Sequence, residues 1–291
     1  YPLSFKYFCI GIAFSLCVQK GGSVDGNPYF CINISKYFPF LSAVKDQHRR
    51  LIENPLILEE DDLGNLHYQM DLSQLDTCSK EASLLMFCSP HNPVGRVWLK
   101  EELLALLAVA KKHNLIILAD EIHADLVYAN MQHHTLSRLA FENAPAPSSI
   151  DAPHAIITAV SPSKTFNIPG LGLSALIIPD ANYRQTIQSH LTKIAVSVTN
   201  PFSMIAFEAA YRGGADWLSE LMAYLQATRD EAVAFIRAHI PKINVVCPEG
   251  TYLLWLDCRK LNLDDKALAL FFVREAQLGL SSGAMLVSAP E

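Results

Sequence analysis

Short apolar runs alternate with amphipathic stretches through the middle of the chain. The runs at 83–88, 115–119 and 154–160 are rich in Leu, Ile, Val and Ala and have the length of buried strands. The stretch at 100–113 has a helical period, and its apolar face would be formed by Leu103, Leu104, Leu107 and Ala110. A strand, a helix and a strand in this order predict a βαβ unit whose strands run parallel.

The second half of the chain continues this alternation with longer helices. We expect strands at 173–178, 243–247 and 251–257, and helices at 180–213, 216–239 and 264–278. Together the elements predict an α/β fold with a mostly parallel sheet, followed by a partial α+β C-terminal part.

Three parts of the chain differ in character. Residues 29–213 hold the strand–helix alternation and are expected to form the large domain, and residues 214–291 an incomplete small domain. Residues 1–28 are an atypical N-terminal segment, in which the apolar run at 7–18 is too short to span a membrane. We interpret this run as a core segment of a truncated chain. The alternative is that the stretch departs from native-like sequence.

Composition and charge exclude several classes of function. The 291 residues carry a net charge of −6, which argues against nucleic acid as a partner. The seven cysteines are odd in number and form no C-x-x-C pair, which indicates reduced thiols in a cytoplasmic protein and no zinc or other metal site. No segment is long and apolar enough for a membrane span.

Polar residues follow three of the expected strands. They are Asn92 after 83–88, Asp120 after 115–119, and Ser161, Ser163 and Lys164 after 154–160. Each has an ordinary interpretation: a turn for Asn92, a helix N-cap for Asp120 and a solvated loop for Lys164. The carboxyl ends of parallel strands, however, meet at one edge of a sheet, where ligands bind.

Together these residues suit pyridoxal 5′-phosphate (PLP). This cofactor needs a lysine amine for a Schiff base and a carboxylate beside its pyridine nitrogen. It also needs donors for its ring oxygen, and hydroxyl or backbone N–H groups for its phosphate.

Longer motifs extend the argument to most of residues 30–283. The segments that carry them are SPHNPVGRVW (89–98), DEIHADLVY (120–128), SPSKTFNIPGL (161–171), NPFSMIAFEAAY (200–211) and EGTYLLWLDCR (249–259). In this order and spacing the chain resembles the fold-type I PLP enzymes of the aminotransferase class I/II family. Within them it is most similar to the cystathionine β-lyase-like, or C–S lyase, branch. The resemblance implies an aspartate aminotransferase-like fold and a homodimer.

The resemblance also implies a role for each matching residue. Lys164 would bind PLP as a Schiff base and act in catalysis, and Asp120 would pair with the pyridinium nitrogen. Asn92 and His123 would bond the ring oxygen of the cofactor. The phosphate ligands would be Ser161 and Ser163, and the aromatic stacked on the ring would be Tyr37, whose alternative is an ordinary buried strand residue.

Other residues of these motifs have structural interpretations. We expect Arg96 and Glu121 to make local structural contacts, and Tyr252 and Trp255 to belong to the core of the small domain. His133 and His134 are expected in an exposed loop with no assigned task.

The chain departs from the family in three places. It lacks most of an N-terminal arm, only Gly11 hints at the turn that cradles the phosphate, and the C-terminus stops before the arginine that binds the substrate carboxylate. The expected function is C–S β-lysis, transamination or both on an amino acid, with cystathionine or a cysteine conjugate as the candidate substrate. The alternatives are a catalytically impaired protein that retains PLP binding or an interaction role, and a gene-prediction fragment.

Overall fold

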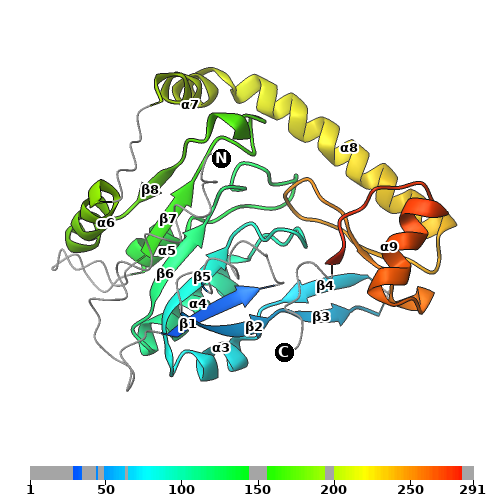
Figure 1. Cartoon of the computed structure of the whole chain (residues 1–291), viewed down its shortest axis with the longest axis horizontal. Coiled ribbons are helices and arrows are strands. Elements are labelled where there is room, and N and C mark those ends of the chain that lie inside the picture. Colours follow the sequence, from blue (N-terminus) through cyan, green and yellow to red (C-terminus); the bar gives the residue numbers. More distant parts are fainter. Residues whose placement is uncertain are drawn as a thin grey trace.

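The computed structural model describes residues 29–34, 44, 49–62, 65–143, 156–193 and 200–283, with backbone alone for 29–34. These residues form an α/β structure around one central sheet (Figure 1). Among the described residues, no helix is long and apolar enough to cross a membrane.

The sheet has six strands in the order β2-β1-β5-β6-β7-β8. Their bounds are β1 (Tyr29–Ile34), β2 (Arg50–Pro55), β5 (Ala82–Cys88), β6 (Ile116–Asp120), β7 (Ile156–Val160) and β8 (Ala175–Ile177). All neighbours run parallel except β8, which is antiparallel to β7. The predicted fold class and the parallel pairing of β5 with β6 are therefore confirmed.

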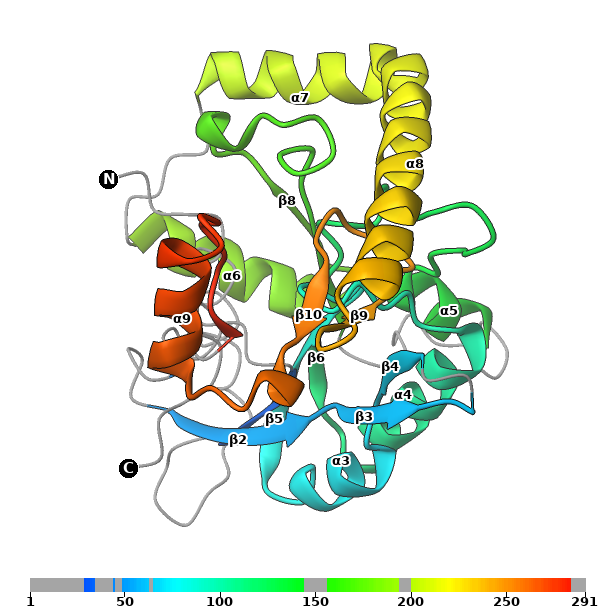
Figure 2. The ribbon, with the colours of Figure 1, turned by 90° about the vertical axis from the view of Figure 1, so that its right-hand side faces the viewer.

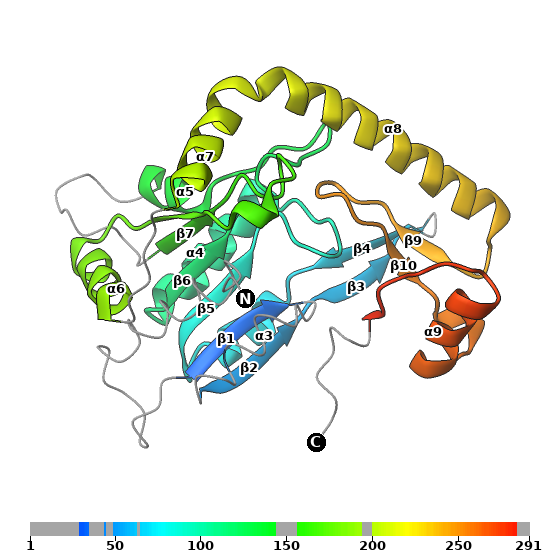
Figure 3. The same cartoon turned by 45° about the horizontal axis from the view of Figure 1, so that its top comes forward.

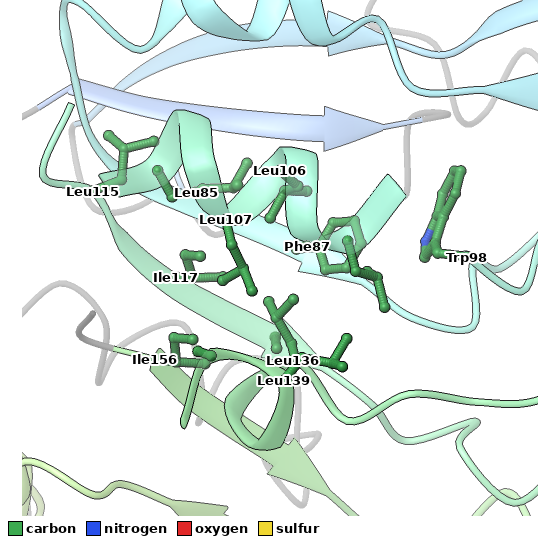
Figure 4. Close-up of a cluster of buried hydrophobic side chains, with 14 of the residues drawn as sticks. Leu85, Phe87, Trp98, Leu106, Leu107, Leu115, Ile117, Leu136, Leu139 and Ile156 are labelled. Carbon is green, nitrogen blue, oxygen red and sulfur yellow. The ribbon is translucent and has the colours of Figure 1, made fainter. Parts of the chain in front are cut away.

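Three helices cover one face of the sheet: α3 (Leu72–Cys78), α4 (Lys100–Lys112) and α5 (Leu136–Glu142). Figure 4 shows apolar side chains of α4 and α5 packed on those of β5, β6 and β7, and Leu75 of α3 belongs to the same cluster. The buried residues of α4 are Leu103, Leu106, Leu107 and Ala110. Leu104, which was predicted on the apolar face, is only half-buried. Burying one such Leu or Phe contributes about 2 kcal/mol, so this cluster fixes the strands that position the site.

The remaining elements lie around this core. They are the hairpin β3 (Ile57–Glu60) and β4 (Leu66–Gln69), the helices α6 (Ala181–Lys193), α7 (Pro201–Gly213), α8 (Ala215–His239) and α9 (Asp265–Arg274), the antiparallel pair β9 (Asn244–Val246) and β10 (Trp255–Asp257), and the 3-10 turns η2 (Pro169–Leu171) and η3 (Arg259–Leu261). Helix α8 runs from a corner with α7 to the β9–β10 pair and α9 (Figures 2 and 3).

Three of the predicted elements are wrong in extent. The helix expected at 264–278 spans only Asp265–Arg274. The single helix expected at 180–213 is divided into α6 and α7, because Asn200 caps a new helix: its side chain accepts a hydrogen bond from the N–H of Phe202, and Pro201 is the first helical residue. The strand expected at 251–257 is confined to β10, because Thr251 takes a left-handed φ of 67°.

Arg96 joins four segments in one ion-pair network. Its guanidinium donates to both carboxylate oxygens of Glu102 at 2.8 and 2.9 Å, to Glu249 Oε2 at 2.5 Å and to the carbonyl of Tyr68 at 2.7 Å. Glu249 also accepts from the N–H of Val97 at 2.8 Å. The Arg96 side chain is only 10% exposed, so the predicted structural role of Arg96 is confirmed.

Backbone contacts extend this junction. The carbonyl of Gly95 accepts from the N–H groups of Glu249 and Gly250 at 2.8 and 3.0 Å. A Cβ on Gly95, whose φ is +74°, would lie 2.4 Å from Pro248 Cβ. Only glycine therefore allows the turn at 248–250 to approach so closely.

We predict that Glu249→Gln lowers the free energy of unfolding by about 2 kcal/mol, because it removes a charged acceptor of hydrogen bonds from Arg96 and from the N–H of Val97, while Arg96 keeps its pair with Glu102. Urea denaturation measures the change. Glu142→Gln is the matched control, because Glu142 pairs with Arg138 on an exposed helix surface and should change stability little. Equal losses in the two variants would contradict the structural importance of the network.

Candidate functional site

The carboxyl ends of β5, β6 and β7 lie side by side. Cys88 pairs with Asp120, and Asp120 pairs with Ala159. The backbone ladder continues into the loops, since Ser89 donates to the carbonyl of Asp120 at 3.0 Å and Glu121 donates to that of Ala159 at 2.9 Å. The loops that carry the predicted site residues therefore leave the sheet at one edge.

Asp120 is the last residue of β6 and is 8% exposed. Its Oδ1 accepts a hydrogen bond from the N–H of Ile122 at 3.3 Å. Residues 121–126 form turns, so Asp120 is not the N-cap of a helix. A carboxylate so largely withdrawn from water favours a cationic partner, such as a protonated ring nitrogen.

Asn92 and His123 are brought together from two loops. Asn92 Nδ2 lies 3.3 Å from His123 Nε2, and the His123 ring is buried. Asn92 can donate this hydrogen bond when Nε2 carries no proton. The pair joins the loop after β5 to the loop after β6.

Tyr252 lies against this pair, and its predicted place in the small-domain core is wrong. Its ring meets the His123 ring edge-on, with centroids 5.7 Å apart, and it is 42% exposed. The cause is the backbone: Thr251 donates to the carbonyl of Leu126 at 2.7 Å, and Val127 forms a bridge with Gly250. The segment EGTY (249–252) belongs to a motif that carries the family resemblance. Strand alternation does not show the change of backbone direction at Thr251.

The Lys164 loop begins with a turn built on serine. The Ser161 hydroxyl donates to the carbonyl of Leu173 at 2.9 Å, and its oxygen accepts from the N–H of Ser163 at 3.2 Å. A role of Ser161 in phosphate binding therefore requires its hydroxyl proton to change partner. Lys164 is half-buried in the same loop.

The residue after Lys164 is fixed by an unpredicted carboxylate. Thr165 is fully buried, and its hydroxyl donates to Asp125 Oδ2 at 3.0 Å. The Tyr211 hydroxyl approaches the same oxygen at 3.5 Å. Burial, with the charge of Asp125 as the second cause, raises the pKa of Tyr211 to about 12. Asp125 lies within the DEIHADLVY motif, but no pattern in the sequence links it to Thr165.

Glu121 has the structural role that was predicted, and the exposed position expected for His133 is wrong. Glu121 is 2% exposed and accepts hydrogen bonds at both oxygens: from the N–H of Leu136 at 3.0 Å, and at 2.9 Å from Nε2 of His133 when that nitrogen is protonated. His133 is drawn inward because a buried carboxylate needs hydrogen-bond partners.

The donor set at this edge fits PLP. It combines a buried carboxylate, a half-buried amine, an amide–imidazole pair and serine hydroxyls, the groups that the ring nitrogen, the aldehyde, the ring oxygen and the phosphate require. Tyr37 and the stretch around Gly11 lie outside the described residues. No group of three or more His, Cys, Asp or Glu side chains that could hold a metal occurs in the described part of the chain.

Comparisons with known proteins agree with this chemistry. The family profile described as aminotransferase class I and II matches residues 63–279. The chain is 35% identical over 278 residues to cystathionine beta-lyase PatB of Bacillus subtilis, covering 95% of this chain and 68% of that protein.

Two solved structures are similar in fold and sequence. Cystalysin from Treponema denticola, which contains PLP, matches with a TM-score of 0.82 and 31% identity, over 95% of this chain and 66% of that one. The PLP-bound C–S lyase from Staphylococcus hominis matches with a TM-score of 0.82 and 27% identity, over 98% of this chain and 69% of that one. The chain thus spans about two thirds of the length of these relatives.

His91, beside Asn92, makes stability depend on pH. It is fully buried against the edge of Trp98, and its Nδ1 has no hydrogen-bond partner in the described part of the chain. Burial, aided by the charge of Arg96, lowers the pKa of His91 from the usual 6.5 to about 3. The folded protein keeps His91 neutral, whereas the unfolded chain takes up a proton below its ordinary pKa. Stability from this residue is therefore lost as pH falls from 6.5 towards 3.

We predict that the free energy of unfolding falls by about 2 kcal/mol more in the wild type than in His91→Gln when pH is lowered from about 7 to about 5. Urea denaturation of both proteins at the two pH values measures the difference. The same pH dependence in both would show that His91 is protonated in the folded protein.

Proposed function

The chain belongs to the aminotransferase class I and II family, and we propose that it acts as a PLP-dependent carbon–sulfur β-lyase on an amino acid. The observation that carries the proposal is the convergence of Asp120, the Asn92–His123 pair and the Lys164 loop at adjacent strand ends. The relatives named as a cystathionine beta-lyase and a C–S lyase favour lysis. Transamination is kept as a second activity, because the two reactions share their first steps.

PLP, which both solved relatives contain, supplies when bound an electron sink for the carbon that carries the substrate amino group. In our proposal, Asp120 holds a proton on the pyridine nitrogen through its buried negative charge. Asn92 hydrogen-bonds the ring oxygen through its N–H groups, and His123 does so when Nε2 carries a proton and no longer accepts from Asn92. Ser161 and Ser163 bind the phosphate, after Ser161 releases the carbonyl of Leu173.

Lys164 has two tasks in the proposed reaction. Its amine would hold the cofactor, and when free it would remove the proton from the substrate α-carbon.

We also propose a homodimer in the cytoplasm, with cystathionine or a cysteine conjugate as substrate. The exposed apolar side chains of α7, Phe202, Met204 and Ile205, support assembly with another chain. The four cysteines with described side chains, Cys78, Cys88, Cys247 and Cys258, form no disulfide within the described part of the chain, which fits a reducing compartment.

We predict that the protein mixed with PLP develops a visible absorbance band that survives Lys242→Ala and is lost in Lys164→Ala. Lys242 is an exposed lysine away from the strand ends and is the matched control. Borohydride should fix the cofactor mass on the peptide that contains Lys164. A band that persists in Lys164→Ala would refute the assignment of this lysine.

We expect cystathionine to be cleaved with release of pyruvate, ammonia and a thiol, and Asp120→Asn to lower this rate by about a hundredfold while PLP still binds. Pyruvate formation measures lysis, and conversion of an added keto acid to an amino acid measures transamination. A band with no turnover of any amino acid would instead support the catalytically impaired alternative, which the comparisons do not favour.

A further inference from the structure

The loop that carries Lys164 is hydrogen-bonded to a charged side chain. Thr165 has no exposed surface, and its hydroxyl donates to Asp125 Oδ2 at 3.0 Å. Lys164 and Thr165 share one peptide unit, so a fixed Thr165 side chain restricts the backbone dihedral angles that aim the Lys164 side chain. A hydrogen bond to a carboxylate is stronger than one between neutral groups.

The next residue, Phe166, packs against aromatic rings. The Phe166 ring lies 5.6 Å from that of Tyr211 on α7 and 5.9 Å from that of Trp217 on α8. Gly214, at the corner between these helices, leaves room for it, since a Cβ there would lie 2.4 Å from Phe166 Cε1. Figure 2 shows this corner, where α7 and α8 meet.

Asp125 contacts both Thr165 and the aromatic residue Tyr211. Its Oδ2 lies 3.5 Å from the Tyr211 hydroxyl as well as 3.0 Å from that of Thr165. Asp125 also belongs to the loop after β6 that contains His123 and follows Asp120. One carboxylate thus links the loop of the proposed ring-binding residues, the loop of the proposed cofactor lysine and helix α7.

We propose that Asp125 is a positioning residue for Lys164, which it holds in register with Asp120 and His123 through the Thr165 hydroxyl. Its meaning for catalysis rests on the proposed function, whereas its effect on the Lys164 loop is independent of any cofactor. A site built from two loops needs such a link, because a small misplacement of the reacting amine lowers the rate strongly.

Packing alone is the competing explanation, and matched variants separate the two. Thr165→Val keeps the shape and the burial of the side chain but removes the hydroxyl. Thr165→Ser keeps the hydroxyl and removes a methyl group. The proposal requires the serine variant to behave like the wild type and the valine variant to behave like Asp125→Ala. If packing alone matters, the valine variant should behave like the wild type and the serine variant like Asp125→Ala.

The experiment is pulse labelling of lysine amines in the protein without cofactor, with peptides read by mass spectrometry. In Thr165→Val and Asp125→Ala we expect Lys164 to be acylated about tenfold faster, the change that loss of a hydrogen bond to a charged group produces in a local opening equilibrium. The double variant should show no further increase, because both changes remove the same bond. Lys112, paired with Asp76 on another face, is the internal reference for an intact fold.

Thr228→Val is the matched control, because it removes a hydroxyl that bonds only a backbone carbonyl within α8. It should leave Lys164 labelling unchanged. Unchanged labelling in Thr165→Val, or additive increases in the double variant, would overturn the proposal. Absence of a PLP band in a wild type that shows the labelling pattern would refute the proposed function and leave the role of Asp125 standing.

Discussion

The structure depends on the contact of one turn, at 248–252, with the loops that follow β5 and β6. Glu249 meets Arg96 in a largely desolvated ion pair, and Gly95 and Gly250 let the backbones approach within hydrogen-bond distance. The Glu249 carboxylate accepts hydrogen bonds from both Arg96 and the N–H of Val97, and Arg96 has a second carboxylate partner in Glu102. It also fixes Thr251 on Leu126, which directs the Tyr252 ring towards His123. Residues more than a hundred positions apart in the chain thereby share one site.

A second constraint comes from the parallel sheet itself. Pairing of β5, β6 and β7 in register places their last residues at one level, so each following loop starts beside the next. The apolar layer of α3, α4 and α5 holds these strands together, and it is built from residues that take no part in the site. Three buried polar residues at the strand ends, Asp120, Glu121 and Ser161, have hydrogen-bond partners, whereas Nδ1 of His91 has none in the described part of the chain. Contacts within the protein therefore order the described part of the candidate site, which lowers the cost of binding a ligand there.

Loops at the edge of the sheet are tied to helices by single side chains. Asp125 joins the loop after β6 to Thr165 and Tyr211, and Arg229 on α8 lies over the Tyr128 ring at 4.2 Å and donates to the carbonyl of Pro248 at 3.1 Å. Helix α8 therefore touches both the turn at 248–252 and the loop after β6. The division of the chain at Gly213–Gly214 into two domains stays a prediction.

The sequence by itself determined the local structure and the chemistry. Hydrophobic periodicity located β5, α4, β6 and β7, because burial of an apolar face requires it, and residue types at the strand ends indicated a PLP site. Only the tertiary structure decided which side chains meet. The break between α6 and α7, the reversal at Thr251, the inward position of His133 and the bond from Thr165 to Asp125 all depend on partners distant in the chain. Local patterns carry no information on such partners, because hydrogen bonds and ring contacts between loops are set by how the strands and helices pack.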